Sequence, residues 1–290
     1  MKPAPFEYHA PEIVDDVVGL LAEHGDEAKP LAGGQSLVPM LAMRLTRFEH
    51  LVDLQRVDSL AGVSREDGHL RVGAMTRQRE LERRAEVGDA VPLLARATPL
   101  VGHFQIRNRG TVGGSLAHAD PASEYPAVAV ALDAEFEVVG GGGLRRVAAS
   151  EFFVSTWTTC LEPDEVLVAA RFPVWGGRCG FAVDEVARRH GDFALAGVAC
   201  AVTLDERGAV TRAGIGLFGM GSTPVRAAAA ETALMGNAVA DADLDDVGAL
   251  AARDAEPLDD VHATAGYRRA VGAHLVTRVV GRALAEAARE

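Results

Sequence analysis

The sequence predicts an α+β fold in two packed units, and three observations support this prediction. The chain has 290 residues, which is more than one typical domain and fewer than three. Helix-like and strand-like segments alternate in the first part, whereas a β-hairpin and Ala-rich helices make up the last part. The composition changes at residues 175–177, a Trp-Gly-Gly stretch typical of a linker. We therefore place the domain boundary near residue 176.

The first unit, residues 1–176, is expected to contain two subdomains. In the first, at about residues 1–57, apolar residues recur at helical spacing over residues 11–24, between Pro11 in the first turn and a stop at Gly25. Residues 51–54 have the pattern of a buried strand. The first subdomain is therefore a small α/β unit.

The second subdomain, at about residues 58–176, is predicted to contain several short elements. A helix over residues 76–86 should begin at Thr76 as its N-cap and end at Gly88. Four glycines at residues 140–143 read as a hairpin turn and not as a phosphate loop. The other expected elements are a strand at 69–74, helices at 91–102 and after Pro126, and strands at 135–139, 144–147 and 165–172.

The second unit, residues 177–290, is predicted to pair residues 199–204 with 208–217 in a hairpin and to continue in helices to the end of the chain. Within this hairpin, Gly214–Gly219 matches the G-x-G-x-x-G pattern of dinucleotide-binding loops. The match lies late in the chain, on an antiparallel hairpin and not after a first parallel strand. We therefore interpret these glycines as structural.

Charge and cysteine content narrow the function. The formal net charge of −12 argues against binding to nucleic acids or to anionic membrane surfaces. The three cysteines, Cys160, Cys179 and Cys200, form neither a disulfide framework nor a cluster-binding set, which favours the cytoplasm. The N-terminal residues have no apolar signal core, and the longest apolar run, residues 127–132, is too short to span a bilayer.

Two glycine-rich loops are the candidate binding features. The first is Leu31–Leu37, of sequence LAGGQSL, and the second is Arg109–Ser115, of sequence RGTVGGS. Paired glycines let backbone amides approach an anion, and the Ser and Thr hydroxyls add donors. Either loop alone is more typical of an ordinary turn than of a binding site. Two such loops, each with a Ser at its exit, could hold a pyrophosphate from both sides without a Lys or Arg, and the pair fits a binding site as well as it fits ordinary turns.

Four segments together resemble the flavin subunit of the xanthine dehydrogenase and carbon monoxide dehydrogenase family. They are Leu31–Pro39 (LAGGQSLVP), Gln105–Pro121 (QIRNRGTVGGSLAHADP), Ala187–Ala194 (ARRHGDFA) and Thr223–Ala227 (TPVRA). The resemblance covers nearly the whole chain in the family's order. It implies an FAD-binding domain of the vanillyl-alcohol oxidase and p-cresol methylhydroxylase type, followed by a three-stranded antiparallel sheet with a helical bundle.

The resemblance also implies which residues contact FAD. The first loop would wrap the pyrophosphate and the second would close it, while Val101, Gly102 and Leu167 would lie near the adenosine half. His118 would lie near the flavin, Glu124 near the sugar or adenine, and Phe193 over the isoalloxazine. The implied contacts are Leu31, Ala32, Gly33, Gly34, Gln35, Ser36, Leu37, Val101, Gly102, Thr111, Gly114, Ser115, His118, Glu124, Leu167 and Phe193.

Several of these positions have structural alternatives. Phe193 stands where the family often has Tyr, and residues 183–186 read VDEV where some members have a Lys, so no cationic contact is carried over. Taken alone, His118 fits an ordinary surface or hydrogen-bonded histidine, and Asp120 fits a turn cap before Pro121. Arg107, like other arginines in these segments, fits either a solvated face or a partner's acidic patch.

The resemblance implies an electron-transfer subunit. A molybdenum-cofactor large subunit would oxidise the substrate, and an iron–sulfur small subunit would pass electrons to this FAD and on to NAD, a quinone, oxygen or another carrier. No catalytic acid, base or nucleophile and no metal site is expected in this chain. The rival interpretations are a self-sufficient FAD-dependent oxidase or dehydrogenase, and a scaffold that has lost its flavin.

Overall fold

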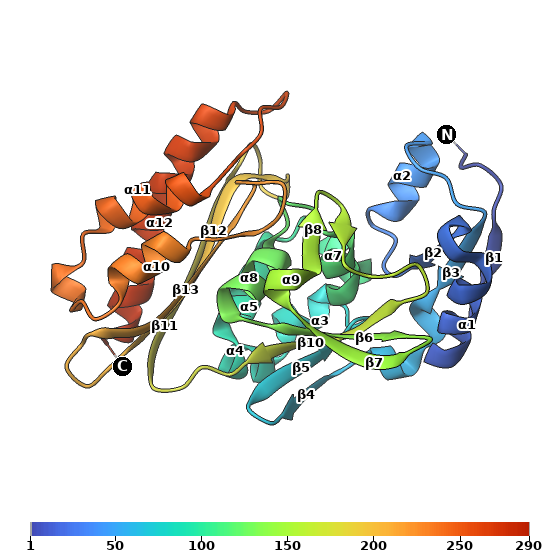
Figure 1. The fold of residues 1–290 in the computed structure, drawn as a ribbon, viewed down its shortest axis with the longest axis horizontal. Coiled ribbons are helices and arrows are strands. Elements are labelled where there is room, and N and C mark those ends of the chain that lie inside the picture. The colour runs from blue at the N-terminus through green and yellow to red at the C-terminus, as the bar shows by residue number, and fades with distance from the viewer. Residues whose placement is uncertain (1, 290) are drawn as a thin grey trace.

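The structure is a computed structural model that describes residues 2–289. Three parts follow one another across the long axis of the molecule: an N-terminal α/β unit, a central unit around a five-stranded sheet, and a C-terminal sheet covered by helices (Figure 1). No helix within residues 2–289 combines the length and the apolar character that crossing a membrane requires.

The N-terminal unit is a three-stranded parallel sheet with helices beside it. The strands β1 (Glu7–His9), β3 (His50–Asp53) and β2 (Ala28–Leu31) are hydrogen-bonded in this order. Val17 and Leu21 of helix α1 (Val14–His24) are fully buried and share a core with Val166 and Val168 of the central unit. The expected helix and strand are therefore confirmed, and the two units pack through one apolar cluster. Helix α2 (Leu37–Met43) follows β2.

The central unit is built on an antiparallel sheet in the order β4-β5-β10-β6-β7. Its strands are β4 (Val63–Glu66), β5 (His69–Gly73), β10 (Val166–Pro173), β6 (Glu135–Gly140) and β7 (Gly143–Ala148). Gly140 pairs with Gly143, which confirms the predicted hairpin turn. Seven helices accompany the sheet: α3 (Gln78–Arg83), α4 (Ala85–Ala90), α5 (Pro92–Ala97), α6 (Phe104–Arg109), α7 (Val112–His118), α8 (Glu124–Leu132) and α9 (Ala149–Phe152). Strands β8 (Phe153–Ser155) and β9 (Thr158–Thr159) form a small separate ribbon.

The prediction of one helix from Thr76 to Gly88 is wrong. The segment forms two short helices, α3 and α4, and Gly88 lies inside the second. Thr76 is fully buried, and its hydroxyl donates to the carbonyl of Gly62 at 2.9 Å and accepts from the amide of Gly62 at 2.9 Å. A long-range contact therefore uses the hydroxyl that local sequence assigns to a helix cap.

The C-terminal part is an antiparallel sheet between two helical layers. Strands β11 (Arg178–Ala187), β12 (Ala194–Leu204) and β13 (Val210–Phe218) form the three expected strands, and the two-residue β14 (Val225–Arg226) adds a fourth that the sequence does not predict. Helix α12 (Ala265–Ala287) packs on β11 and β12, with α10 (Ala228–Leu234) and α11 (Leu244–Asp254) beside it, and α8 contacts β12 and β13 (Figure 1).

The late G-x-G-x-x-G match is structural, as expected. A Cβ added to Gly214 would lie 2.0 Å from the carbonyl oxygen of Ala131, and one on Gly216 would lie 2.2 Å from that of Ala127. Both carbonyls belong to α8, which is buried along its whole length. The glycines of β13 therefore serve the close approach of a helix backbone to a strand.

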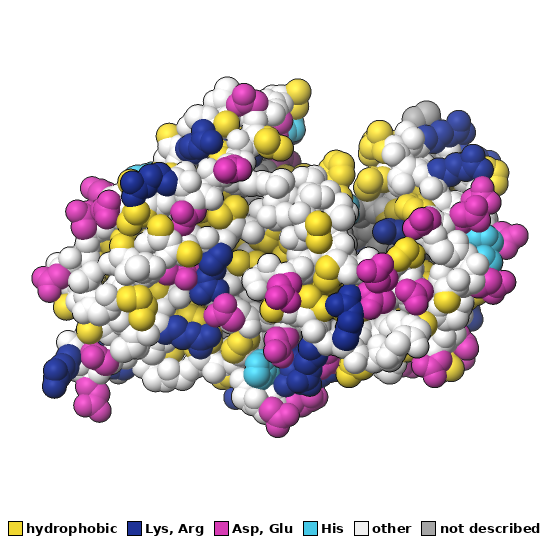
Figure 2. Space-filling view, in the orientation of Figure 1, with side chains coloured by type: hydrophobic (Ala, Val, Ile, Leu, Met, Phe, Trp, Pro, Cys, Tyr) yellow, Lys and Arg dark blue, Asp and Glu magenta, His cyan; other side chains and the backbone are white. Residues whose placement is uncertain are grey.

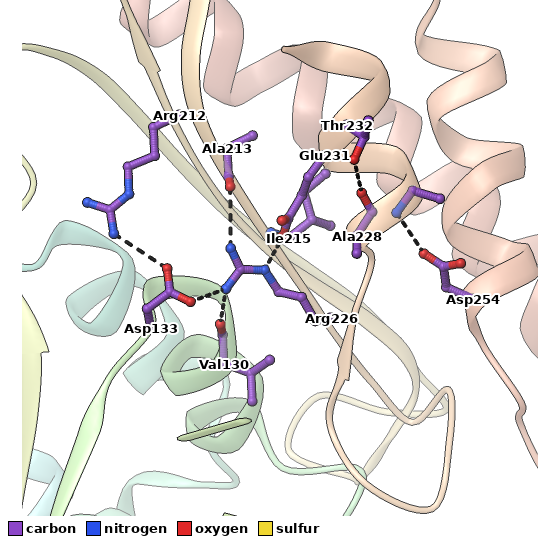
Figure 3. Close-up of polar contacts among 11 residues, drawn as sticks. Val130, Asp133, Arg212, Ala213, Ile215, Arg226, Ala228, Glu231, Thr232 and Asp254 are labelled. Atoms are coloured by element: carbon purple, nitrogen blue, oxygen red, sulfur yellow. Dashed lines mark hydrogen bonds and ion pairs between the residues drawn. The ribbon is translucent and has the colours of Figure 1, made fainter. Parts of the chain in front are cut away.

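Arg226 fastens the C-terminal sheet to α8. Its guanidinium donates to the carboxylate of Asp133 at 2.6 Å, to the carbonyl of Val130 at 2.7 Å, and to Glu231 (Figure 3). Glu231 also accepts from the backbone amide of Ile215 at 2.7 Å. One side chain of β14 therefore joins α8, β13 and α10.

Candidate cofactor-binding site

The two glycine-rich loops predicted from the sequence touch each other. The first connects β2 to α2, and the second connects α6 to α7. A Cβ added to Gly33 would lie 2.4 Å from the carbonyl oxygen of Arg109 and 2.8 Å from Cα of Gly110. A Cβ on Gly114 would lie 3.1 Å from Cβ of Ala32. Loops 70 residues or more apart in sequence thus meet backbone to backbone, and side chains at these positions would separate them.

The first loop presents unused backbone donors. Gly34 has φ +71°, a conformation that glycine adopts without strain. The amide side chain of Gln35 donates to the carbonyl of Gly33 at 3.0 Å and holds the turn. The backbone amides of Gly33 to Ser36 donate no hydrogen bond to any part of the chain that the structure describes. Since buried or half-buried amides are normally paired, four consecutive unpaired amides fit an anionic ligand.

The second loop contributes differently from the first. Thr111 caps α7: its side-chain oxygen accepts from the amide of Gly114 at 3.0 Å, and its carbonyl accepts from the amide of Ser115 at 3.2 Å. These amides are therefore engaged within the protein. What remains for a ligand on this side is the half-buried hydroxyl group of Ser115 and the small surface of Gly114. The Thr111 side chain is 1% exposed and its oxygen already accepts from Gly114, so only its hydroxyl hydrogen is left to donate.

Contacts behind the second loop hold it against the central sheet. A Cβ on Gly113 would lie 2.4 Å from Cβ of Ala74, so this glycine permits α7 to begin directly against the end of β5. The amide of Gln78 donates to the carbonyl of Gly110 at 3.0 Å, and the guanidinium of Arg77 donates to the carbonyl of Arg109. The loop is therefore fixed before any ligand binds.

A cation that sequence analysis passed over lies near this site. The surface is hollowed between the N-terminal and central units (Figure 2). Lys29, two residues before the first loop, lies on β2 with its ammonium 5.7 Å from the Phe48 ring centre. Although solvent reaches this side chain, desolvation by the surrounding protein lowers the pKa of Lys29, and its charge helps to lower the pKa of His118. The signal in the sequence is the position of Lys29, which stands directly before Pro30 and the start of the first glycine-rich loop at Leu31.

His118 ends α7 and faces an aromatic ring. Its imidazole is stacked on Trp157, with 6.4 Å between ring centres and an angle of 11° between the planes. Burial is the main cause that lowers the pKa of His118, so the neutral imidazole is favoured. Asp120 accepts from the amide of Ala122 at 2.9 Å and from the Trp157 indole at 3.2 Å, which is the turn-capping alternative.

A buried carboxyl group begins α8. Glu124 is 9% exposed, and burial raises its pKa to about 8. Its side chain makes no hydrogen bond within residues 2–289 apart from a contact with its own backbone. Glu185 of β11 is close enough to raise that pKa further, and burial raises the pKa of Glu185 itself to about 7. One buried oxygen of Glu185 also lacks a partner. A buried polar atom without a partner is costly, so the Glu185 oxygen fits a ligand hydroxyl at this place.

Arg107 settles one of the alternatives left by the sequence. It is buried at 7% exposure, pairs with Glu82 at 3.1 Å, and donates to the carbonyls of Val101 and Gly102 at 3.1 and 2.9 Å. It is therefore neither a solvated side chain nor free for a partner's acidic patch. It shapes the turn at Val101–Gly102 that the resemblance places beside the cofactor.

That turn contacts the C-terminal part of the chain. Gly102 has φ +50°, and the ring of His103 lies so close to Gly191 that an added Cβ would meet it at 2.6 Å. Phe193, two residues beyond Gly191, is 67% exposed. The Val101–Gly102 turn and Phe193 therefore lie near the same junction, and the Phe193 ring is free to cover a ligand.

Leu167, which the sequence predicts as an FAD contact, lies in the core and away from the two glycine-rich loops. It lies in β10 opposite Val138, is 4% exposed, and belongs to the main core. Helix α7 packs against β10, so Leu167 lies behind the site. The structure thus groups the first loop with Thr111, Gly114 and Ser115, and groups Glu124, Val101, Gly102 and Phe193 at the C-terminal junction.

Comparison with known protein families assigns the chain. A family model described as the FAD binding domain in molybdopterin dehydrogenase matches residues 4–175. A second, described as the CO dehydrogenase flavoprotein C-terminal domain, matches residues 181–283. The chain therefore belongs to the family of FAD-binding subunits of molybdopterin dehydrogenases, and FAD is the cofactor of this family.

Individual relatives are similar in sequence to this chain over nearly its full length. The chain is 40% identical to 6-hydroxypseudooxynicotine dehydrogenase complex subunit alpha of Paenarthrobacter nicotinovorans, over 98% of this chain and 96% of the relative. It is 37% identical to the carbon monoxide dehydrogenase medium chain of Hydrogenophaga pseudoflava, over 99% of this chain and all of the relative. A solved structure of carbon monoxide dehydrogenase from the latter organism superposes with a TM-score of 0.96 at 39% identity, covering 99% of each chain.

Proposed function

We propose that this chain is the FAD-binding electron-transfer subunit of a molybdenum hydroxylase and holds the FAD diphosphate between its two glycine loops. The observation that carries this proposal is the contact between the loops, with four unpaired amides at residues 33–36. Full-length similarity to dehydrogenase subunits supports the same function. The chain is accordingly an oxidoreductase subunit.

The residues of the first loop bind the diphosphate through backbone amides, from Leu31 to Leu37. Thr111 and Ser115 add hydroxyl donors, and Gly114 leaves room for the ligand. Glu124 accepts from a sugar or adenine donor, beside the Val101–Gly102 turn and in front of Leu167. His118 lies toward the flavin end, and Phe193 covers one face of the ring. Bound FAD supplies the two-electron chemistry, and these residues orient it and exclude water.

The proposed partners are a molybdenum-cofactor large subunit and an iron–sulfur small subunit. The names of several relatives describe medium chains or subunits of a complex, which supports such an assembly. We place the FAD-binding domain at residues 1–176, with subdomains at about 1–57 and 58–176, and the C-terminal domain at 177–290. The sparse cysteines, three in 290 residues, support a cytoplasmic location.

Purification from the native host tests this function. The co-purified complex should contain FAD, iron and molybdenum, and reduction by substrate should bleach the flavin only when all three subunits are present. A single active yellow chain that reduces its acceptor without iron or molybdenum would instead establish the self-sufficient oxidase or dehydrogenase.

A further inference from the structure

Three histidines from separate elements converge on one side of the N-terminal sheet. His9 ends β1, His50 begins β3, and His24 ends α1. Nε2 of His9 lies 3.1 Å from Nδ1 of His50, and the rings of His24 and His50 are stacked with 3.7 Å between centres and 6° between planes. A ligand nitrogen from each of the three lies within 4.8 Å of the others.

Strand pairing and the end of α1 explain why the three histidines meet on one face of the sheet. In the parallel pairing of β1 with β3, Glu7 lies opposite His50, so His9, two residues on, projects to the same face of the sheet as both. Helix α1 brings His24 to this face at its last residue. The three imidazoles are half-buried, which leaves them open to solvent on one side.

From this geometry we propose that His9, His24 and His50 form a binding site for a divalent first-row transition-metal ion such as Zn²⁺. Imidazole is a preferred ligand of these ions, and three nitrogens at 2.0–2.1 Å from Zn²⁺ in a tetrahedron lie about 3.3 Å apart. The present separations reach that spacing by rotation of the side chains alone. The ion replaces the His9–His50 hydrogen bond and separates the stacked rings.

The charges around the cluster favour a cation. A carboxylate oxygen of Glu7 lies 3.6 Å from Nδ1 of His50, and the Glu7 side chain is 75% exposed and free to move. Acidic side chains surround the histidine cluster over β1 and α1 (Figure 2). The fourth ligand is therefore either the Glu7 carboxylate or a water molecule. Within residues 2–289 no other group of His, Cys, Asp or Glu meets the same distance criterion.

The proposed ion joins strand β1, strand β3 and the end of helix α1. Strand β1 has only three residues and lies at an edge of the sheet, and the ion ties it to β3 and to the end of α1. This role does not depend on FAD, because the cluster lies outside the glycine loops. Metal binding should therefore stabilise the N-terminal unit whether or not flavin is present.

The test is a Zn²⁺ titration of the untagged, chelator-treated full chain by calorimetry. Wild-type protein should bind one ion per chain and unfold at a higher temperature with Zn²⁺ than without. His24→Gln and His9→Gln should each weaken binding by about tenfold or more and abolish the thermal shift. The matched control is His274→Gln, an exposed histidine of α12, which should bind like wild type.

Cobalt gives a second readout that does not depend on stability. Co²⁺ bound to three imidazoles in four-coordinate geometry should give visible d–d absorption in the wild type and in His274→Gln, and not in His24→Gln. Equal Zn²⁺ affinity in wild type and His24→Gln would overturn the proposal, as would a wild-type protein that binds no ion in tenfold excess.

Discussion

The backbones of Gly33 and Gly110 are in contact, so closely that a Cβ on Gly33 would lie 2.8 Å from Cα of Gly110. Gly33 belongs to the N-terminal unit and Gly110 to the central unit, and this contact sets the distance between their loops. Because neither position tolerates a side chain without displacement, the cradle for the diphosphate depends on two glycines far apart in sequence.

Gly114→Ala should weaken FAD binding by about tenfold or more, equivalent to ~1.4 kcal/mol. The new methyl group would lie 2.7 Å from the Thr111 hydroxyl and 3.1 Å from Ala32, which forces the two loops apart. Flavin content after purification measures the effect. Gly142→Ala is the control, since an added Cβ there meets nothing within 4 Å. Equal flavin content in both variants would show that the loops do not enclose the cofactor.

Gly34→Val should also lower the flavin content, because Gly34 has φ +71°, a backbone conformation that valine rarely adopts.

Glu124→Gln should change how the stability of the FAD-free chain depends on pH. The folded-state pKa of Glu124 is about 8, above the ordinary value of 4.5, so between these pH values the folded state retains a proton that the unfolded chain has lost. The wild-type free energy of unfolding should therefore fall as pH rises across this window. The variant should lose less stability over the same range, which thermal melts at pH 5 and pH 8.5 would measure. Parallel pH profiles would mean that burial does not raise the pKa of Glu124.

Phe193→Ala should leave FAD bound but change its absorption spectrum or its rate of oxidation by oxygen. Phe193 is 67% exposed beside the Val101–Gly102 turn, so its loss removes a cover from the flavin without creating a cavity in the core. Phe6→Ala, a second partly exposed phenylalanine at 38%, is the control. If the spectrum and oxidation rate match the wild type, Phe193 does not cover the ring.

Arg226→Lys should lower the free energy of unfolding by about 2 kcal/mol, because lysine cannot reach Asp133, Val130 and Glu231 together. Chemical denaturation would measure the loss. Arg47→Lys, at an exposed pair with Glu49, should change stability by less than about 1 kcal/mol. Similar losses in both variants would mean that the junction in Figure 3 adds little to the packing of α8.

The sequence predicted the local elements better than the long-range contacts. Periodicity located α1, and the glycine run located the β6–β7 turn, because both patterns are local. Thr76 was misassigned because its hydroxyl bonds to Gly62, 14 residues away. The two-residue β14 carries too few residues for any alternation to be visible.

In the candidate site, too, the sequence predicted the local loops but not the long-range contacts between them. Gly–Gly pairs marked both loops, but only the fold shows that Gly33 meets Gly110 and that the amides of Gly114 and Ser115 are already used. Glu185 of β11 lies close enough to Glu124 at the start of α8 to raise its pKa, and no spacing in the sequence indicates this pairing. The three-histidine cluster was missed for the same reason, since its members are 15 and 26 residues apart.

The most direct test of the two-loop cradle is a crystal structure of the complete complex with FAD bound. Diphosphate oxygens should lie within hydrogen-bonding distance of the backbone amides of residues 33–36, with Thr111 or Ser115 on the opposite side. A diphosphate bound elsewhere, with those amides facing solvent, would contradict it.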